Sequence, residues 1–267
     1  MTGQVWGKCS IRRQAPGIQA HRLLAEAARH SDSTRVVVVV TSDKCYENRE
    51  WVWGYREDDP MGGHDPYSNS KGCAELVTAT YRKSFFASGT GVSRAAVASA
   101  RAGNVIGGGD WAKDRLIPDI IHAFSKQRPV VIRSPKAVRP WQHVLEPLSG
   151  YLRLAERMWD GADEYQGAWN FGPDQSDARP VDWIVEQLRT MWGGAASWSL
   201  DENLHPHEAH LLKLDISKAR ALPGWSPRLE LRTALEWTEG WYREFLADEA
   251  SARSVTERQI ADYERLG

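Results

Sequence analysis

Residues 36–51, VVVVVTSDKCYENREW, are followed after a short loop by residues 65–72, DPYSNSKG, and these two segments carry the strongest fold signal in the chain. Five consecutive valines are apolar on both faces of a strand, which is typical of a central strand in a parallel sheet. The polar residues Ser42, Asp43 and Lys44 come directly after it. Because ligands bind beyond the carboxyl ends of parallel strands, a functional site is expected at this position.

Outward from this strand, strands and helices alternate along the chain, which predicts a parallel α/β sheet with right-handed crossovers. Residues 1–16 have no periodicity. The first helix is expected to turn Ile18, Leu23, Leu24, Ala27 and Ala28 inward. The expected strands are 35–41, 95–101, 130–132 and 211–214, and the expected helices are 18–30, one starting near residue 67, 116–127, 180–192, one from 231 to 245, and 250–267.

Composition excludes several classes of protein. The 267 residues are 42% hydrophobic and 26% charged with a net charge of −1, so neither a nucleic-acid surface nor a membrane surface is indicated. No apolar run approaches the ~20 residues that span a bilayer. Three cysteines without CxxC spacing favour a reduced, cytoplasmic setting and no metal site.

Tyr67 and Lys71 are four residues apart at the head of the helix that follows the valine strand. That spacing places both side chains on one helix face. A tyrosine with a free pKa of about 10 can act as a base near neutrality only beside a positive charge, which Lys71 could supply. The alternative is an ordinary helix with an exposed tyrosine and lysine.

The turn Ser42–Lys44 offers a second set of groups. Ser42 can hydrogen-bond a hydroxyl that is being oxidised, and the adjacent Asp43 and Lys44 could exchange protons with a substrate. The competing interpretation is an Asx-turn with a surface salt link.

The run TSDKCYENREWVWGYREDDPMGGHDPYSNSKGCAELV, residues 41–77, resembles the extended branch of the short-chain dehydrogenase/reductase superfamily. Within it, the run is most similar to the nucleotide-sugar dehydratases of the CDP-glucose 4,6-dehydratase family. The resemblance implies that NAD is the cofactor, with Tyr67 as redox base and Lys71 as its partner, both touching NAD. It also implies that Asp43 is the acid that expels water and Lys44 the base.

Further segments resemble parts of the same family that contact the sugar nucleotide. The glycine cluster after residue 101 lacks the Gly-Lys-Ser/Thr ending of a triphosphate loop. Isolated asparagines and histidines are more often surface groups, and this is the alternative interpretation for Asn170 and His207. The candidates for substrate binding are Asn104 in RAGNVIG, Leu116 in RLIPD, Arg139 in VRPWQHV, Asn170 in WNFGPD and His207 in HPHEAH.

The chain departs from the family pattern at its start. Only 35 residues precede the valine strand, and they contain no GxxGxxG turn of the kind that cradles a dinucleotide. The expected fold is therefore a partial Rossmann-like parallel sheet with its first strands missing, a small, mostly helical substrate lobe, low NAD affinity and an exposed edge at the valine strand. The expected domains are 17–167, 168–250 with contributions from 104–145, and a C-terminal helix over 251–267.

Three functions remain open at this point. The first is NAD-dependent dehydration of CDP-glucose to CDP-4-dehydro-6-deoxyglucose, by an enzyme that could pair as a homodimer. The second is a non-catalytic protein that binds sugar nucleotides or acts as a scaffold. The third is a nucleotide-sugar epimerase, which the Asp43–Lys44 doublet disfavours because epimerisation eliminates no water.

Overall fold

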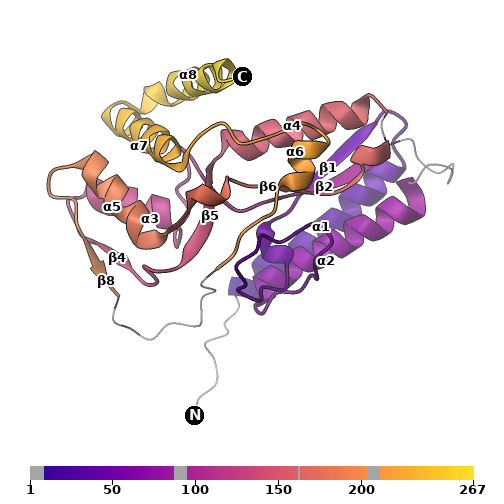
Figure 1. Ribbon diagram of the computed structural model, residues 1–267, viewed down its shortest axis with the longest axis horizontal. Helices are drawn as coiled ribbons and strands as arrows, with labels where there is room; N and C mark the ends of the chain where they lie inside the picture. The colour runs from indigo at the N-terminus through magenta and orange to yellow at the C-terminus, as the bar shows by residue number, and fades with distance from the viewer. Residues whose placement is uncertain (1–8, 87–94, 162, 202, 204–210) are drawn as a thin grey trace, which may run out of the picture. The chain divides into compact units, whose positions relative to one another are not determined.

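The computed structural model describes residues 9–86, 95–161, 163–201, 203 and 211–267. The chain divides into two compact units, each assembled from three separate stretches (Figure 1). Unit 1 comprises Met1–Gly103, Ser149–Phe171 and Leu214–Ser226, and unit 2 comprises Asn104–Leu148, Gly172–Lys213 and Pro227–Gly267. The domain bounds expected from the sequence stay a prediction.

Unit 1 is built on a parallel three-stranded sheet of order β1-β2-β6. The valine run forms β1 at the edge of this sheet, in register with β2 from the pair Val36–Ala96 to the pair Val40–Ala100. The elements of unit 1 are α1 (Cys9–Arg29), β1 (Val36–Val40), the 3-10 turn η1 (Asp43–Cys45), α2 (Pro66–Tyr81), the π-helical turn η2 (Arg82–Phe86), β2 (Ala96–Ala102), α4 (Leu145–Trp159, from Ser149 onward), η3 (Asp163–Tyr165), β6 (Gly167–Phe171) and α6 (Ser217–Ala221).

Helices cover both faces of this sheet, as Figure 1 shows. On one face, Ala28 of α1 and Phe86 pack against Val97 and Val37. On the other face, a larger cluster joins α4 and α6 to alternate residues of the strands, namely Ala98, Ala100, Leu154, Met158, Trp169, Phe171 and Ala219. The expected α/β class with a parallel sheet is confirmed.

The first helix differs from its prediction in length and in orientation. Helix α1 begins at Cys9, so a helix includes residues for which the sequence indicates no structure. Leu23 and Leu24, expected to face inward, are 55% and 68% exposed, and Ala28 is the buried position. Ala27, also expected to face inward, is exposed as well. The prediction was wrong for these three residues because α1 packs on α2 and on the sheet near Ala28, and apolar spacing does not show which side of a helix another element covers.

Unit 2 combines two small sheets with four helices among its described residues. In the sheet β3-β5-β7, β3 and β5 are parallel but β7 is antiparallel to β5. The strand expected over 211–214 is wrong, because only isolated bridges form at Leu211 and Leu214. The elements are β3 (Asn104–Ile106), α3 (Leu116–Ser125), β4 (Val130–Ile132), β5 (Val138–His143), η4 (Gln175–Asp177), β7 (Ala178–Pro180), α5 (Val181–Trp192), β8 (Trp198–Leu200), α7 (Leu231–Ala247), η5 (Glu249–Ser251) and α8 (Ala252–Arg265).

A large apolar cluster lies at the centre of the described part of unit 2. It unites α3, α5 and α7 around strands β4 and β5, and its fully buried members include Ile120, Ile184, Leu188, Leu235 and Tyr242. These residues recur at three- and four-residue intervals along their helices, which is why each helix has one continuous apolar face.

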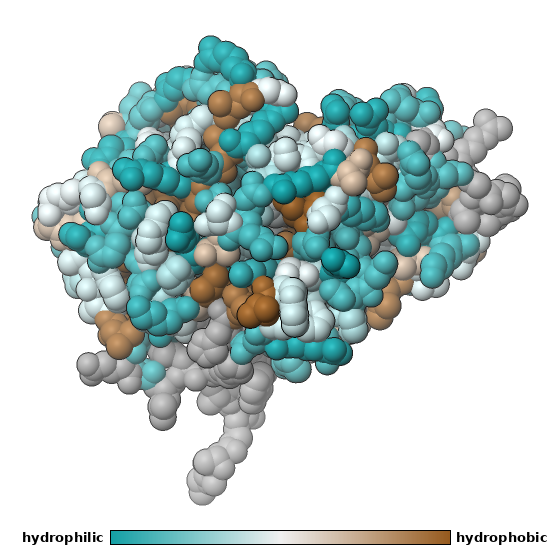
Figure 2. All heavy atoms as spheres, viewed as in Figure 1, coloured by the Kyte–Doolittle hydropathy of each residue, from teal (hydrophilic) through white to brown (hydrophobic). Residues whose placement is uncertain are grey.

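The surface is mixed in character. On the face drawn in Figure 2, hydrophilic residues predominate and hydrophobic ones form small separate groups. Within the described ranges, no helix combines the length and the apolar character that crossing a membrane requires.

Candidate active site

The turn after β1 places the Ser42–Lys44 segment at the carboxyl end of the parallel sheet of unit 1. Ser42 caps the short turn η1, because its Oγ accepts a hydrogen bond from the backbone N–H of Lys44 at 3.2 Å. The same hydroxyl donates to Oδ1 of Asp43 at 3.0 Å. Asp43 is only 2% exposed. The local sequence therefore fixes the carboxyl group of Asp43 in a defined position.

Helix α2 carries the Tyr67–Lys71 pair and begins with a strong start signal. Asp65 caps it by accepting hydrogen bonds from the backbone N–H groups of Tyr67 at 2.9 Å and Ser68 at 3.0 Å, and Pro66 occupies the first turn. The Nζ atom of Lys71 lies 5.5 Å from the centroid of the Tyr67 ring. Tyr67 is 48% exposed. A phenol with an ammonium group beside it is thus accessible at the start of this helix.

The Ser42–Lys44 turn, called the doublet turn below, is in contact with helix α2. Gly72 allows a close approach, since a Cβ atom there would lie 3.3 Å from the carbonyl oxygen of Cys45. Burial acts to raise the pKa of Asp65, but hydrogen bonds from Ser68 and Tyr67 and the charge of Lys44 outweigh it and lower that pKa. The positive charge of Lys44 therefore helps to stabilise the Asp65 carboxylate that caps α2.

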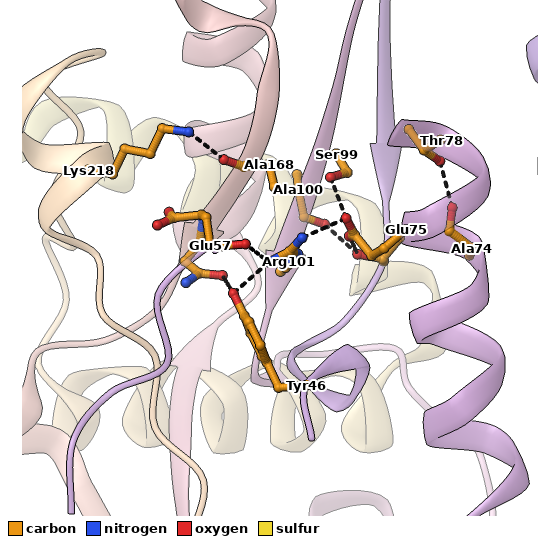
Figure 3. Close-up of polar contacts among 12 residues, drawn as sticks. Tyr46, Glu57, Ala74, Glu75, Thr78, Ser99, Ala100, Arg101, Ala168 and Lys218 are labelled. Carbon is orange, nitrogen blue, oxygen red and sulfur yellow. Dashed lines mark hydrogen bonds and ion pairs between the residues drawn. The ribbon is translucent and has the colours of Figure 1, made fainter. Parts of the chain in front are cut away.

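A buried ion pair lies behind these groups, and the sequence analysis did not identify it. The guanidinium of Arg101, at the end of β2, donates from Nη2 to Oε2 of Glu75 on α2 at 2.8 Å (Figure 3). Their side chains are 1% and 2% exposed. Burial alone would raise the pKa of Glu75, but the hydrogen bonds and charge of Arg101, with the hydroxyls of Ser99 and Thr41, hold it below its usual value.

Two sequence signals could have revealed this pair. Glu75 follows Lys71 by one more helical turn, so it shares the helix face of Tyr67 and Lys71. Arg101 is a charged residue within an otherwise small and apolar strand, AVASARA. A long charged residue in a buried strand requires a partner, and Glu75 is that partner.

Tyr46 connects Arg101 to β6. Its hydroxyl accepts a hydrogen bond from Nη1 of Arg101 at 2.7 Å and donates to Oδ1 of Asn170 at 2.7 Å. Nδ2 of Asn170 donates to the carbonyl oxygens of Tyr55 and Asp215, at 2.8 and 3.2 Å. Asn170 is completely buried. These bonds favour a positioning role for Asn170, and its expected contact with the substrate stays a prediction.

Three further candidates for substrate binding belong to unit 2. Asn104 is the first residue of β3 and Leu116 the first residue of α3, both in unit 2. Arg139 is a buried residue of β5, and its Nη1 donates to the carbonyl oxygen of Val138 at 3.0 Å. His207 lies outside the described residues. The five candidates for catalysis therefore all lie in unit 1, in or directly before η1 and on α2, two elements that contact each other. Their roles stay predictions.

The glycine cluster after β3 has a packing reason. A Cβ atom at Gly108 would lie 2.0 Å from the ring of Trp241, so only glycine fits there. Gly109 adopts a positive φ of 79°. Neither observation indicates a phosphate-binding loop.

Cys45, the last residue of η1, is fully buried. Burial raises the pKa of the Cys45 thiol to about 12, which keeps it protonated at neutral pH. Among the residues that the structure describes, no group of three or more histidines, cysteines and carboxylates could hold a metal ion.

Comparison with known proteins gives a consistent result. The NAD dependent epimerase/dehydratase family matches residues 17–172. The chain is 52% identical over 244 residues to the CDP-glucose 4,6-dehydratase of Salmonella typhimurium, covering 90% of this chain and 67% of that protein.

Two solved structures share the fold. The dTDP-glucose 4,6-dehydratase of Bacillus anthracis in complex with NAD has a TM-score of 0.74 at 18% identity, over 93% of this chain and 73% of the other. The UDP-glucuronic acid 4-epimerase of Bacillus cereus in complex with UDP-glucuronic acid and NAD has a TM-score of 0.73 at 19% identity, over 86% and 68%. At these identities the likeness concerns the fold alone.

Proposed function

This chain belongs to the NAD dependent epimerase/dehydratase family, and from that premise we propose that it converts CDP-glucose to CDP-4-dehydro-6-deoxyglucose with NAD. The observation that carries the proposal is the 52% identity to a CDP-glucose 4,6-dehydratase over 90% of the chain. The Asp43–Lys44 doublet beside the Tyr67–Lys71 pair supports it, because dehydration needs both a redox base and an acid/base pair.

Among the described residues, Tyr67 and Lys71 fit the nicotinamide end of NAD, where the oxidation would occur. An accessible phenol with an ammonium group beside it is the donor set that would hold the nicotinamide ribose and take the hydroxyl proton of carbon 4. When bound, NAD would supply the acceptor for the hydride of carbon 4 and the donor that returns it to carbon 6. The charge of Lys71 stabilises the phenolate form of Tyr67 that this chemistry requires.

The turn after β1 would carry out the elimination. Once carbon 4 is a ketone, the proton on carbon 5 is acidic, and Lys44 would be the base that removes it. Asp43 would protonate the hydroxyl on carbon 6, so that the C–O bond breaks and water leaves. Lys44 would then return a proton to carbon 5 as hydride arrives at carbon 6. The sum of these steps is loss of one water from CDP-glucose.

Ser42 would hold the hydroxyl of carbon 4 during oxidation. Asn104, Leu116 and Arg139 stay candidates for contacts with the sugar nucleotide. A guanidinium suits the pyrophosphate because its planar fork donates two hydrogen bonds. A cytoplasmic location and a homodimer, both expected from the sequence, stay predictions.

The test is incubation of the full chain with CDP-glucose and NAD. The expected product is one water lighter than the substrate by mass spectrometry and absorbs ultraviolet light after treatment with base. Tyr67→Phe should abolish its formation. Tyr81→Phe, at the other end of the same helix, is the matched control and should leave product formation unchanged.

Three other outcomes would contradict the proposal. A product of unchanged mass would indicate an epimerase. Binding of CDP-glucose without any product, in the presence of saturating NAD, would indicate a binding protein or scaffold. Faster turnover of UDP-glucose or dTDP-glucose than of CDP-glucose would reassign the nucleotide.

A further inference from the structure

The Glu75 carboxylate accepts hydrogen bonds from two hydroxyl groups, one on strand β2 and one on the residue that follows β1. Oε2 accepts from Oγ of Ser99 on β2 at 2.6 Å, and Oε1 accepts from Oγ1 of Thr41. Thr41 follows β1 directly and precedes Ser42 and Asp43. One oxygen of a single buried carboxylate is thus bonded to the chain immediately before the doublet turn, while the other is bonded to a strand that carries no candidate for catalysis.

Arg101 makes the corresponding contact on the other side of the turn. Its Nη1 donates to the hydroxyl of Tyr46, the residue that follows η1, and to the carbonyl oxygen of Glu57 at 3.0 Å (Figure 3). Because Arg101 is also paired with Glu75, the segment from Thr41 to Tyr46 is held at both ends by one ion pair. Tyr46 is further fixed by its stacking on Tyr55, with ring centroids 5.1 Å apart.

The same carboxylate belongs to the helix that carries the redox pair. Tyr67, Lys71 and Glu75 are spaced at intervals of four residues on α2 and so share one helix face. A shift of α2 along its axis, or a rotation about it, would break the bonds of Glu75 to Thr41 and Arg101. Directional bonds inside a low-dielectric interior resist such shifts more strongly than apolar contacts do.

We propose that Glu75 and Arg101 are positioning residues that hold the Ser42–Lys44 turn in register with the Tyr67–Lys71 face of α2. This inference rests on the proposed function for its catalytic consequence. Dehydration requires the redox pair and the acid/base doublet to act on adjacent carbons of one hexose, and a displacement of about 1 Å can reduce a rate about a hundredfold. The pair acts through the turn and the helix and touches no substrate.

The chain offers a matched set of variants for the test. Thr41→Val removes the hydroxyl that links Glu75 to the turn and keeps the shape of the side chain. Ser99→Ala removes the other hydroxyl on the same carboxylate, without touching the turn. Thr41→Ser restores the linking hydroxyl. All three variants leave Glu75 and Arg101 in place, so the buried charges stay paired.

The first measurement is hydrogen exchange of the full chain without ligands. The backbone N–H groups of Cys45 and Tyr46 donate to the carbonyl oxygens of Ser42 and Asp43, at 3.1 and 3.3 Å, and report on the turn. They should exchange about tenfold faster in Thr41→Val, and at the parental rate in Thr41→Ser and Ser99→Ala. Equal exchange in Thr41→Val and Ser99→Ala would overturn the inference.

The second measurement is steady-state turnover of CDP-glucose with NAD. Thr41→Val should lower kcat at least about tenfold with KM changed less than about threefold, and Thr41→Ser should restore kcat. Ser99→Ala should change neither constant by more than about threefold. A similar kcat for Thr41→Val and Ser99→Ala would show a role in stability only.

The two measurements separate the inference from the function on which it rests. If the parental chain does not dehydrate CDP-glucose, the proposed function fails while the exchange experiment still decides whether the ion pair fixes the turn. If Thr41→Val does not fold, Tyr46→Phe cuts the connection at the other end of the turn by removing the hydroxyl that accepts from Arg101. Parental exchange and parental kcat in Tyr46→Phe would then overturn the inference.

Discussion

In unit 1, the side chains buried behind the candidate active site are charged or polar, whereas the centre of unit 2 is apolar. The unit 1 network joins Glu75, Arg101, Tyr46 and Asn170 through hydrogen bonds of 2.7 to 2.8 Å. The unit 2 cluster is made of isoleucine, leucine, valine and aromatic side chains. Apolar packing is tolerant of direction, but hydrogen bonds and ion pairs are not.

The two units differ in where they bury directional bonds. A buried charge lowers stability unless it is fully paired, so an apolar centre is the simpler way to hold a fold together. Unit 1 also has apolar clusters on both faces of its sheet, but in addition it buries a paired, hydrogen-bonded network. This network lies next to the Ser42–Lys44 turn and to the helix with Tyr67 and Lys71. Four predictions test this comparison.

The largest effect is expected within the candidate active site. Asp43→Asn removes the proton that would expel water, so formation of the dehydrated product should fall by roughly 10²–10⁴-fold. Oxidation at carbon 4 should survive, because Tyr67 and Lys71 are unchanged. Mass spectrometry of the reaction distinguishes the 4-keto sugar that keeps its water from the dehydrated product. The exposed Asp32→Asn is the matched control, and undiminished dehydration by Asp43→Asn would remove Asp43 from the mechanism.

The second prediction compares the two centres by their stability. Arg101→Met leaves the buried Glu75 carboxylate without its ion pair and should lower the free energy of unfolding by roughly 3–5 kcal/mol. Leu188→Ala, in the apolar cluster of unit 2, should cost about 2–5 kcal/mol through the cavity that it leaves. Urea denaturation measures both.

A second substitution separates the two mechanisms. Adding Glu75→Met to Arg101→Met should recover much of the lost stability, since no charge is then left unpaired. Adding Leu235→Ala to Leu188→Ala should destabilise further. Additive losses in both pairs would mean that the polar centre behaves like an apolar one.

The third prediction concerns the one buried histidine of β5. Burial lowers the pKa of His143 to about 4, from an unfolded value of about 6.5. The unfolded chain therefore binds a proton first, and unit 2 should lose roughly 3 kcal/mol of stability as pH falls from 6.5 to 4, with no effect above that range. Denaturation at a series of pH values measures the loss.

Substitution isolates the contribution of this histidine. His143→Phe should make stability nearly independent of pH between 6.5 and 4 relative to the parental chain, whereas the exposed His122→Gln should not. Burial raises the pKa of the neighbouring acid Glu146, so the difference between variant and parent is the quantity to compare. An unchanged pH dependence in His143→Phe would assign the effect to other groups.

The smallest effect concerns the fit of the apolar centre. In Gly108→Ala the new methyl group would meet the Trp241 ring, and the strain should cost about 1–3 kcal/mol. Gly240→Ala, within helix α7, meets nothing within 4 Å and should be neutral or slightly stabilising. Thermal denaturation of both variants measures the difference, and equal melting temperatures would show that the loop yields to the ring.

Much of the architecture follows from local sequence. The strand at 130–132 was predicted to the residue, and the helix starting near Tyr67 begins one residue earlier, at Pro66. Elements of this kind can be predicted because their signals lie within a few residues of one another. The signals are an apolar run such as that of β1, an Asp-Pro helix start and a regular apolar spacing. The buried face of α1 was misjudged, since spacing alone cannot say which side of a helix another element will cover.

The parallel α/β class and the position of Tyr67 and Lys71 at the head of α2 could be predicted from the sequence alone. Both depend on spacing along the chain, which the geometry of a strand or a helix converts directly into position. Only the tertiary structure decided that Glu75 on α2 meets Arg101 on β2, that Asn170 is enclosed by hydrogen bonds, and that Leu23 and Leu24 stay exposed. Such contacts join residues far apart in the chain, and packing of whole elements selects them.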